Sequence, residues 1–248
     1  MTKTDDYKTK LQELSNWDEY LLKESGLPGP RGNIELAQVV ADMGKKSLFE
    51  RYIAYDAETA PVNSPYEFLA FCGVVGLGRL LAEGDSELLS ILRCFASDPR
   101  WRIREAVAMA LQRLGDVSME RLLDAMRTWA QGTPLEQRAA AAALSEPRLL
   151  HKAQFARTVL EILDQITTGI EQAKNRRSTD FLILRKGLGY CWSVAVISLP
   201  EEGKALMEKW LLKSDKDIRW IMKENLKKNR LSRMDADWVK RWNDSMRQ

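Results

Sequence analysis

The chain has 248 residues and a mass of 28.4 kDa, which is enough for one elongated domain or two compact ones with a buried core. Apolar residues make up 45% and charged residues 29%, a balance that excludes a disordered chain. The 38 basic and 35 acidic residues leave a net charge of only +3, so the overall charge does not demand a polyanionic partner.

The sequence has the features of a cytoplasmic protein. Its three cysteines form no C-x-x-C pair, which suits a reducing compartment. No run of eighteen apolar residues occurs, and the polar beginning, MTKTDDYKTK, is unlike a signal peptide. We therefore expect a soluble protein that does not contact a membrane.

Helical periodicity runs through almost the whole chain, and sustained alternation of period two does not occur. Three helix starts combine an N-cap with proline: Ser64-Pro65, Asp98-Pro99 and Thr133-Pro134. Gly84 is expected to end the first of these helices and Gly115 the second. Further helices are expected over 85–97, 117–131, 152–173 and 178–198, and after residues 200, 214 and 235. The predicted fold class is all-α.

The helix starts recur at a fixed period. Ser64, Asp98 and Thr133 follow one another at intervals of 34 and 35 residues, which is the length of one helix pair. A shift of 119 residues also superimposes Asp98, Arg100 and Trp101 on Asp217, Arg219 and Trp220, so that D-x-R-W-x-[IM]-[RK]-E-x-[VL] occurs twice. The pattern predicts an α-solenoid, a superhelix of antiparallel HEAT-like helix pairs. We expect an N-terminal helical cap over 1–60 and one continuous repeat array over 61–248, ending in a cap helix that carries Trp238 and Trp242.

The segment DPRWRIREAVAMAL resembles a unit of the HEAT-repeat family, whose second helix typically begins with Asp and carries Arg six residues later. Within that family it is similar to the AlkD-like group of bacterial DNA-alkylation-repair proteins, through Asp98, Trp101, Arg104 and Ala106. The resemblance implies a helical-repeat fold with a binding surface formed by the second helices, on the concave side. That group also uses a Trp-Trp-Asp cluster, and this sequence contains no such triplet. Its absence argues against glycosylase activity.

The repeated motif has two interpretations. In the structural one, Asp98 and Asp217 cap their helices, while Arg104 and Lys223 bond acids of neighbouring repeats. In the functional one, the motif supplies nucleic-acid contacts. Arg100 and Arg219 oppose the helix dipole in the first turn, which hints at an external anion. Trp101 and Trp220 share a helix face with the following cation, so they are either packing residues or stacking platforms for a base.

Positive charge is concentrated after residue 100. Residues 1–100 carry a net charge of −5, whereas 101–200 and 201–248 carry +4 each. A dense basic cluster lies near the end of one C-terminal helix: Lys223, Lys227, Lys228, Arg230 and Arg233. It is either a solvated helix end or a surface that follows a phosphate backbone.

The stretch RKGLGYCW (185–192) interrupts a helix with Gly187 and Gly189. We expect a kink or a close helix approach there. The alternative is a ligand held beside Arg185, Lys186 and Tyr190. The segment GVVGLG (73–78) has the wrong glycine order for a dinucleotide-binding loop.

No catalytic constellation is found in the sequence. His151 is the only histidine, and Cys72, Cys94 and Cys191 lie in apolar helices, where they are expected to be core residues. We expect no metal and no cofactor. The sequence therefore predicts a non-catalytic scaffold that binds nucleic-acid backbone, DNA above all, through a basic concave face. The alternatives are a protein-interaction scaffold and, if the chain is an enzyme, a DNA N-glycosylase for alkylated bases.

Overall fold

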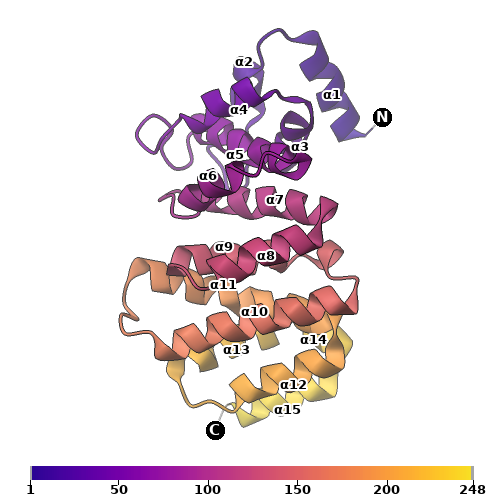
Figure 1. Ribbon diagram of the computed structural model, residues 1–248, viewed down its shortest axis with the longest axis vertical. Helices are drawn as coiled ribbons and strands as arrows, with labels where there is room; N and C mark the ends of the chain where they lie inside the picture. The colour runs from indigo at the N-terminus through magenta and orange to yellow at the C-terminus, as the bar shows by residue number, and fades with distance from the viewer. Residues whose placement is uncertain (1, 247–248) are drawn as a thin grey trace. The chain divides into compact units, whose positions relative to one another are not determined.

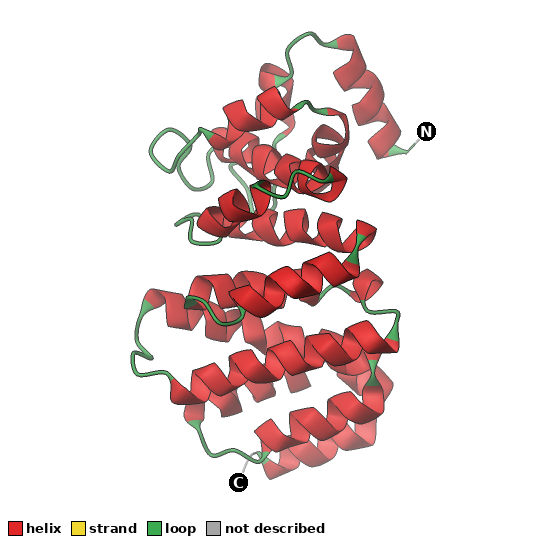
Figure 2. Cartoon of the chain, in the orientation of Figure 1, coloured by secondary structure: helices red, strands yellow, loops and turns green. Residues whose placement is uncertain are grey.

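A computed structural model describes residues 2–246, and every regular element in that range is helical (Figures 1 and 2). The predicted all-α class is confirmed. The α-helices in chain order are α1 (Lys3–Glu13), α2 (Asp18–Glu24), α3 (Ile34–Met43), α4 (Lys46–Ile53), α5 (Pro65–Glu83), α6 (Leu88–Phe95), α7 (Trp101–Val117), α8 (Met119–Trp129), α9 (Pro134–Leu144), α10 (Ala153–Gln172), α11 (Thr179–Ser198), α12 (Pro200–Leu211), α13 (Lys216–Leu226), α14 (Asn229–Met234) and α15 (Ala236–Ser245). A turn of 3-10 helix, Pro147–Leu149, lies between α9 and α10.

The helices form two compact units, Met1–Val117 and Ser118–Gln248. The first unit contains α1 to α7 and the second contains α8 to α15. The boundary between the units lies after Val117, whereas the sequence predicts an N-terminal cap that ends at residue 60. Helix α5, which follows residue 60, packs directly against α3 and α4. The helices that precede residue 60 therefore share a core with α5.

The long apolar helix α5 is the centre of the first unit, where it packs against α3, α4 and α7. The segment GVVGLG lies inside this helix and is buried. A Cβ atom added at Gly76 would overlap the Phe49 ring of α4, and one added at Gly78 would overlap the backbone of Ala110 in α7. The glycines therefore allow two neighbouring helices to approach α5 closely.

The second unit is built from antiparallel helix pairs in two layers (Figure 1). The second helices of the pairs, α9, α11 and α13, pack side by side in one layer, and α8, α10 and α12 form the other. Trp129, Trp192 and Trp210 are at most 2% exposed, as their apolar surroundings in the sequence predict. Each helix pair buries its apolar faces against the next pair, which is the packing expected of a helical repeat.

Local capping explains several of the helix starts. At α9, Thr133 and Glu136 form a complete capping box, with backbone–side-chain hydrogen bonds of 2.7 and 3.3 Å. Ser64 also caps α5. The Glu67 carboxylate accepts a hydrogen bond from the backbone N–H of Asn63, so it does not form a capping box with Ser64.

The last helix docks through its tryptophans, as expected. Trp238 is 1% exposed, and its indole N–H donates to Glu208 of α12 at 2.6 Å. The Trp242 indole N–H donates to the same carboxylate oxygen at 3.3 Å. These two contacts fix α15 against α12.

Three local expectations are wrong. Gly115 does not end α7, which continues through it to Val117. Cys94 is exposed on α6, whereas Cys72 and Cys191 are buried as expected. Asp217 does not cap α13, because the preceding Asp215 accepts the N-terminal N–H groups. The short helix α14 was not anticipated.

Two helices, α5 and α11, are long and apolar enough to cross a membrane by length and composition. Most of each apolar window is buried inside the protein, 72% for α5 and 56% for α11. Burial of this kind is what the core helices of a helical repeat require.

Candidate functional site

The first-turn arginine of the first motif is a structural residue. Arg100 is only 1% exposed, and its guanidinium forms an ion pair with Asp98 at 2.7 Å. One of its nitrogens also donates to the backbone carbonyls of Tyr55, Asp56 and Ala60. The prediction that Arg100 contacts nucleic acid is therefore wrong, because its hydrogen-bonding capacity is used inside the first unit.

Two further predicted contacts are also engaged internally. Arg104 is buried and donates to the backbone carbonyls of Asp98 and Pro99 at 2.5 and 3.0 Å. Arg219 is partly buried and donates to the backbone carbonyl of Met246 at 2.9 Å. The burial of Arg104 contradicts its predicted contact with nucleic acid, whereas Arg219 is only partly buried and its predicted contact stays a prediction.

The remaining predicted residues of the second unit come together. They lie on α11, α13 and α14 and in the link between α13 and α14, and contacts across these helices join Arg185 to Trp220 and Arg230 to Tyr190. The structure therefore merges two sets that the sequence left separate, the C-terminal basic cluster and the residues around the glycine interruption. We call this surface the basic face; its members are Arg185, Lys186, Tyr190, Trp220, Lys223, Lys227, Lys228 and Arg230.

One part of the basic face is centred on Arg185. Its guanidinium lies over the Trp220 ring, 4.5 Å from the centroid, and donates to Asp217 at 2.6 Å. Asp217 is buried and also pairs with Arg176 at 3.2 Å. The acid of the second motif thus bonds a cation of the preceding helix pair. The cations that bond Asp217 are Arg176 and Arg185.

Arg176 holds a second carboxylate beside this network. It pairs with Asp215 at 2.5 Å. Burial acts to raise the pKa of Asp215, but hydrogen bonds from Arg176 and from two backbone N–H groups outweigh it and lower that pKa. Asp215 therefore stays ionised at neutral pH, and it anchors both Arg176 and the start of α13.

The two glycines of α11 mark its approach to neighbouring helices, and α11 is continuous across them. A Cβ at Gly189 would lie 3.1 Å from the Glu224 Cβ and 3.2 Å from the Trp220 ring. A Cβ at Gly187 would lie 3.2 Å from the Arg138 Cγ of α9. The predicted close approach of neighbouring helices is therefore confirmed.

The remaining lysines of the basic face follow helical spacing. Lys223 and Lys227 lie three and seven residues after Trp220, the first in the last turn of α13 and the second at its C-cap. Lys186 lies one turn before Tyr190 on α11, and all three lysines are exposed. Glu224 lies between them and pairs with Lys227 at 2.5 Å. Asp217 and Glu224 pair with two cations of this face, Arg185 and Lys227, and so offset part of its positive charge.

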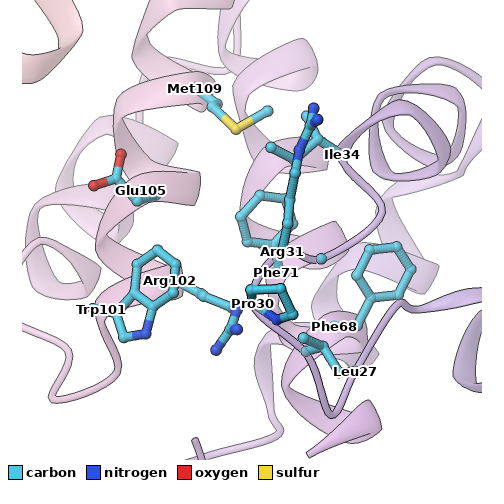
Figure 3. A pocket seen from close by; sticks show the side chains of 11 residues that line it. Leu27, Pro30, Arg31, Ile34, Phe68, Phe71, Trp101, Arg102, Glu105 and Met109 are labelled. Atoms are coloured by element: carbon cyan, nitrogen blue, oxygen red, sulfur yellow. The ribbon is translucent and has the colours of Figure 1, made fainter. Parts of the chain in front are cut away.

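Trp101 occupies a different site, a pocket in the first unit with a volume of about 270 Å³ (Figure 3). We call it the Trp101 pocket. Figure 3 shows Trp101, Glu105 and Met109 of α7 along one side, with aromatic rings of α5 opposite. Trp101 is 46% exposed. The lining residues are Leu27, Pro30, Arg31, Gly32, Ile34, Phe68, Phe71, Trp101, Arg102, Glu105 and Met109.

Arg102 holds the wall of this pocket in place. It donates to the backbone carbonyl of Gly29 at 2.7 Å and pairs with the fully buried Glu67 at 3.2 Å. Its guanidinium also lies over the Trp101 ring, 4.5 Å from the centroid. The Asn63 side chain completes the link by accepting the Gly29 N–H at 3.0 Å. These contacts fix the 26–33 loop against α7.

The chemistry available at the two sites differs. The basic face offers cations and aromatic rings, whereas the Trp101 pocket offers aromatic walls and one carboxylate, Glu105. Within residues 2–246, no group of three His, Cys, Asp or Glu side chains is arranged to hold a metal ion. His151 is exposed in a loop, with Nδ1 3.0 Å from the Arg148 carbonyl.

Sequence reasoning did not identify Arg102, Glu67 or the 26–33 loop as parts of one pocket. They come from segments up to 73 residues apart, and the hydrogen bond that joins Arg102 to the loop uses the backbone carbonyl of Gly29. The usable signal was Trp101 followed four residues later by Glu105, because this spacing places an aromatic ring and a carboxylate on one helix face.

No profile of a protein family matches the sequence, and no curated protein matches it. Among solved structures, the chain is similar to the crystal structure of AlkD2 from Streptococcus mutans, with a TM-score of 0.60 and 18% sequence identity. The match covers 91% of this chain and 98% of that one. At this level of identity, the similarity shows a shared all-helical repeat fold. The similarity supports the AlkD-like resemblance at the level of the fold. No family model of HEAT repeats matches the sequence.

Proposed function

We propose that the protein is a scaffold that binds the backbone of nucleic acid, DNA in the first instance, through the basic face of its second unit. The observation that supports this proposal is an excess of positive charge on α11, α13 and α14 and in the link between α13 and α14, where six cationic side chains stand against two contacting carboxylates, Asp217 and Glu224. The six are Arg185, Lys186, Lys223, Lys227, Lys228 and Arg230.

The physical basis is the release of counterions. Double-stranded DNA carries a condensed ion atmosphere, and each phosphate that a lysine or arginine neutralises releases part of it. Contacts of this type position a protein on the duplex without reading its sequence. A face of cations on rigid helices fits this mode, and its charge disfavours the alternative of a protein partner on an apolar or mixed surface.

Fluorescence anisotropy of labelled duplex and single-stranded DNA across a salt series tests the proposal. With four or five phosphates neutralised, the logarithm of the association constant is expected to fall with the logarithm of salt concentration with a slope of about −4. The triple variant Lys227→Glu/Lys228→Glu/Arg230→Glu is expected to bind at least about 100-fold more weakly at low salt.

The matched control is Lys8→Glu/Lys10→Glu/Lys23→Glu, which makes the same change in net charge at exposed positions of α1 and α2. It is expected to stay within about threefold of the wild type, because these lysines lie outside the basic face. Equal losses in both variants, or no binding by the wild type at low salt, would refute the proposal. The search would then turn to capture of a protein partner.

A second candidate, base excision, is favoured by the Trp101 pocket. Hydrolysis would break the bond between the sugar C1′ and the base nitrogen, with the electron pair leaving on the base and water adding to C1′. Glu105 is the carboxylate suited to stabilise positive charge on the sugar. Release of base from alkylated DNA tests this function, and it should fall at least about 100-fold in Glu105→Gln. Base release by Glu105→Gln at the wild-type rate would exclude this role of Glu105.

A further inference from the structure

Tyr190 is an exposed aromatic residue with two cations placed against it. It lies on α11 with 44% of its surface exposed. The Arg230 guanidinium lies 4.5 Å from the ring centroid, and one of its nitrogens donates to the tyrosine hydroxyl at 2.6 Å. The Lys228 ammonium lies 5.8 Å from the same centroid.

Within the described residues, neither of the two cations has an acidic partner. Lys227 pairs with Glu224, whereas neither Lys228 nor Arg230 forms an ion pair within residues 2–246. The single hydrogen bond of the Arg230 side chain in that range uses one terminal nitrogen, which leaves its other donors for an external acceptor. Two unpaired positive groups held on one ring repel each other, so this arrangement favours an anion between them.

Tyr190 restricts the conformational freedom of the Arg230 side chain. A free arginine side chain has many rotamers, and binding an anion would cost that freedom. The ring face fixes the guanidinium by a cation–π contact, and the hydroxyl fixes its rotation. Because Tyr190 projects from the exposed side of α11, away from the buried residues of that helix, it has no core-packing role that would account for it.

We propose that Tyr190 is a positioning residue that holds Arg230, together with Lys228, as a binding pair for a phosphodiester group. This inference rests on the proposed function, because it names the phosphate subsite of the basic face. It also assigns the aromatic residue a role other than base stacking, since the ring is occupied by the arginine.

The affinity for DNA and its salt dependence distinguish a positioning role of Tyr190 from a contribution of the cationic side chains. Tyr190→Leu keeps every cation but removes the platform, so we expect about tenfold weaker DNA binding with an unchanged salt slope. Tyr190→Phe keeps the ring and loses only the hydroxyl contact, so a loss of about threefold is expected. Tyr190→Trp is expected to rescue most of the affinity. Arg230→Gln should reduce the salt slope by about one.

The control is Tyr66→Leu, which removes an equally exposed tyrosine whose ring contacts Tyr55 and lies under no cation of residues 2–246. It should bind like the wild type, and thermal unfolding should show that all variants are folded. Inorganic phosphate serves as a competitor. If millimolar phosphate displaces DNA from the wild type as effectively as from Tyr190→Leu, Tyr190 does not build a phosphate site.

Wild-type affinity in Tyr190→Leu would overturn this inference while leaving the proposed function intact, because the charged face would still bind. Failure of the wild-type protein to bind DNA at low salt would overturn both. A tenfold loss at constant slope, rescued by Tyr190→Trp, would establish the positioning role.

Discussion

Arginine residues in this protein act in two ways, according to the groups around them. Arg100 makes its hydrogen bonds to one carboxylate and three backbone carbonyls and is 1% exposed. Arg230 contacts one tyrosine and keeps donors toward solvent. The first arrangement stabilises the fold of the first unit, whereas the second leaves a charge available to a partner.

Replacement of each arginine by methionine should separate these roles. Arg100→Met leaves Asp98 without its ion-pair partner in a buried environment and is expected to lower the free energy of unfolding by about 3–5 kcal/mol. Arg230→Met is expected to change it by less than about 0.5 kcal/mol and to weaken DNA binding instead. Urea unfolding and anisotropy measure the two effects, and the reverse assignment would contradict the account.

At the scale of helices, contacts between side chains and backbone determine how closely α11 approaches its neighbours. Gly187 faces the flexible Arg138 side chain of α9, whereas Gly189 faces the Glu224 Cβ and the Trp220 ring of α13. The two glycines therefore lie in the same helix but oppose neighbours of different rigidity.

Substituting each glycine by alanine should have opposite effects on stability. Alanine has the higher helix propensity, by about 1 kcal/mol. Gly187→Ala is expected to raise the free energy of unfolding by up to that amount, because the Arg138 side chain can move. In Gly189→Ala, the new Cβ meets atoms fixed to α13, so a net loss of about 1 kcal/mol is expected. Equal stabilisation by both substitutions in urea unfolding would be inconsistent with this packing.

The first unit contains a pH-dependent link between α2 and α4. Asp18 accepts hydrogen bonds from Arg51 and from the Tyr52 hydroxyl, the latter at 2.6 Å. The Arg51 guanidinium, followed by the Tyr52 hydroxyl, outweighs burial and lowers the pKa of Asp18 below its usual 3.8. Since the folded state binds this proton less readily than the unfolded state, the link stabilises above the usual pKa and is lost as pH falls through the lower, folded value.

Asp18→Asn should therefore lower the free energy of unfolding at neutral pH and remove part of its decline on acidification. Denaturant unfolding of the wild type and variant from neutral pH to about pH 3 measures this difference. The difference between the two curves should narrow as the pH falls below the usual pKa of 3.8. A constant difference over the whole range would show that the carboxylate charge is not involved.

Local sequence signals predicted the helices well because capping acts within three or four residues. Thr133 with Glu136 is an example, since both partners of the capping box are close in sequence. The roles of Arg100 and Tyr190 could not be predicted in this way. Their partners lie about 40 residues away, and those of Arg100 include backbone carbonyls that have no side-chain signature. The basic cluster was predictable from composition, but its junction with α11 depends on packing between helices.

For the molecule as a whole, the distribution of charge matters more than its total. The net charge is only +3, yet residues 1–100 carry −5 and the rest of the chain is positive. Within the second unit, cations from three helices lie on the basic face, where each adds to the local potential. A polyanion is therefore expected to contact this face and not the acidic N-terminal region.

Lysine footprinting tests this central claim most directly. The full-length protein would be treated with an amine-acetylating reagent, with and without duplex DNA, and the modification of each lysine measured by mass spectrometry. Protection is expected at Lys186, Lys223, Lys227 and Lys228, whereas Lys8, Lys10 and Lys23 should react equally in both samples. Protection of the α1 and α2 lysines with the basic face still reactive, or no protection at DNA concentrations that saturate binding, would contradict the account.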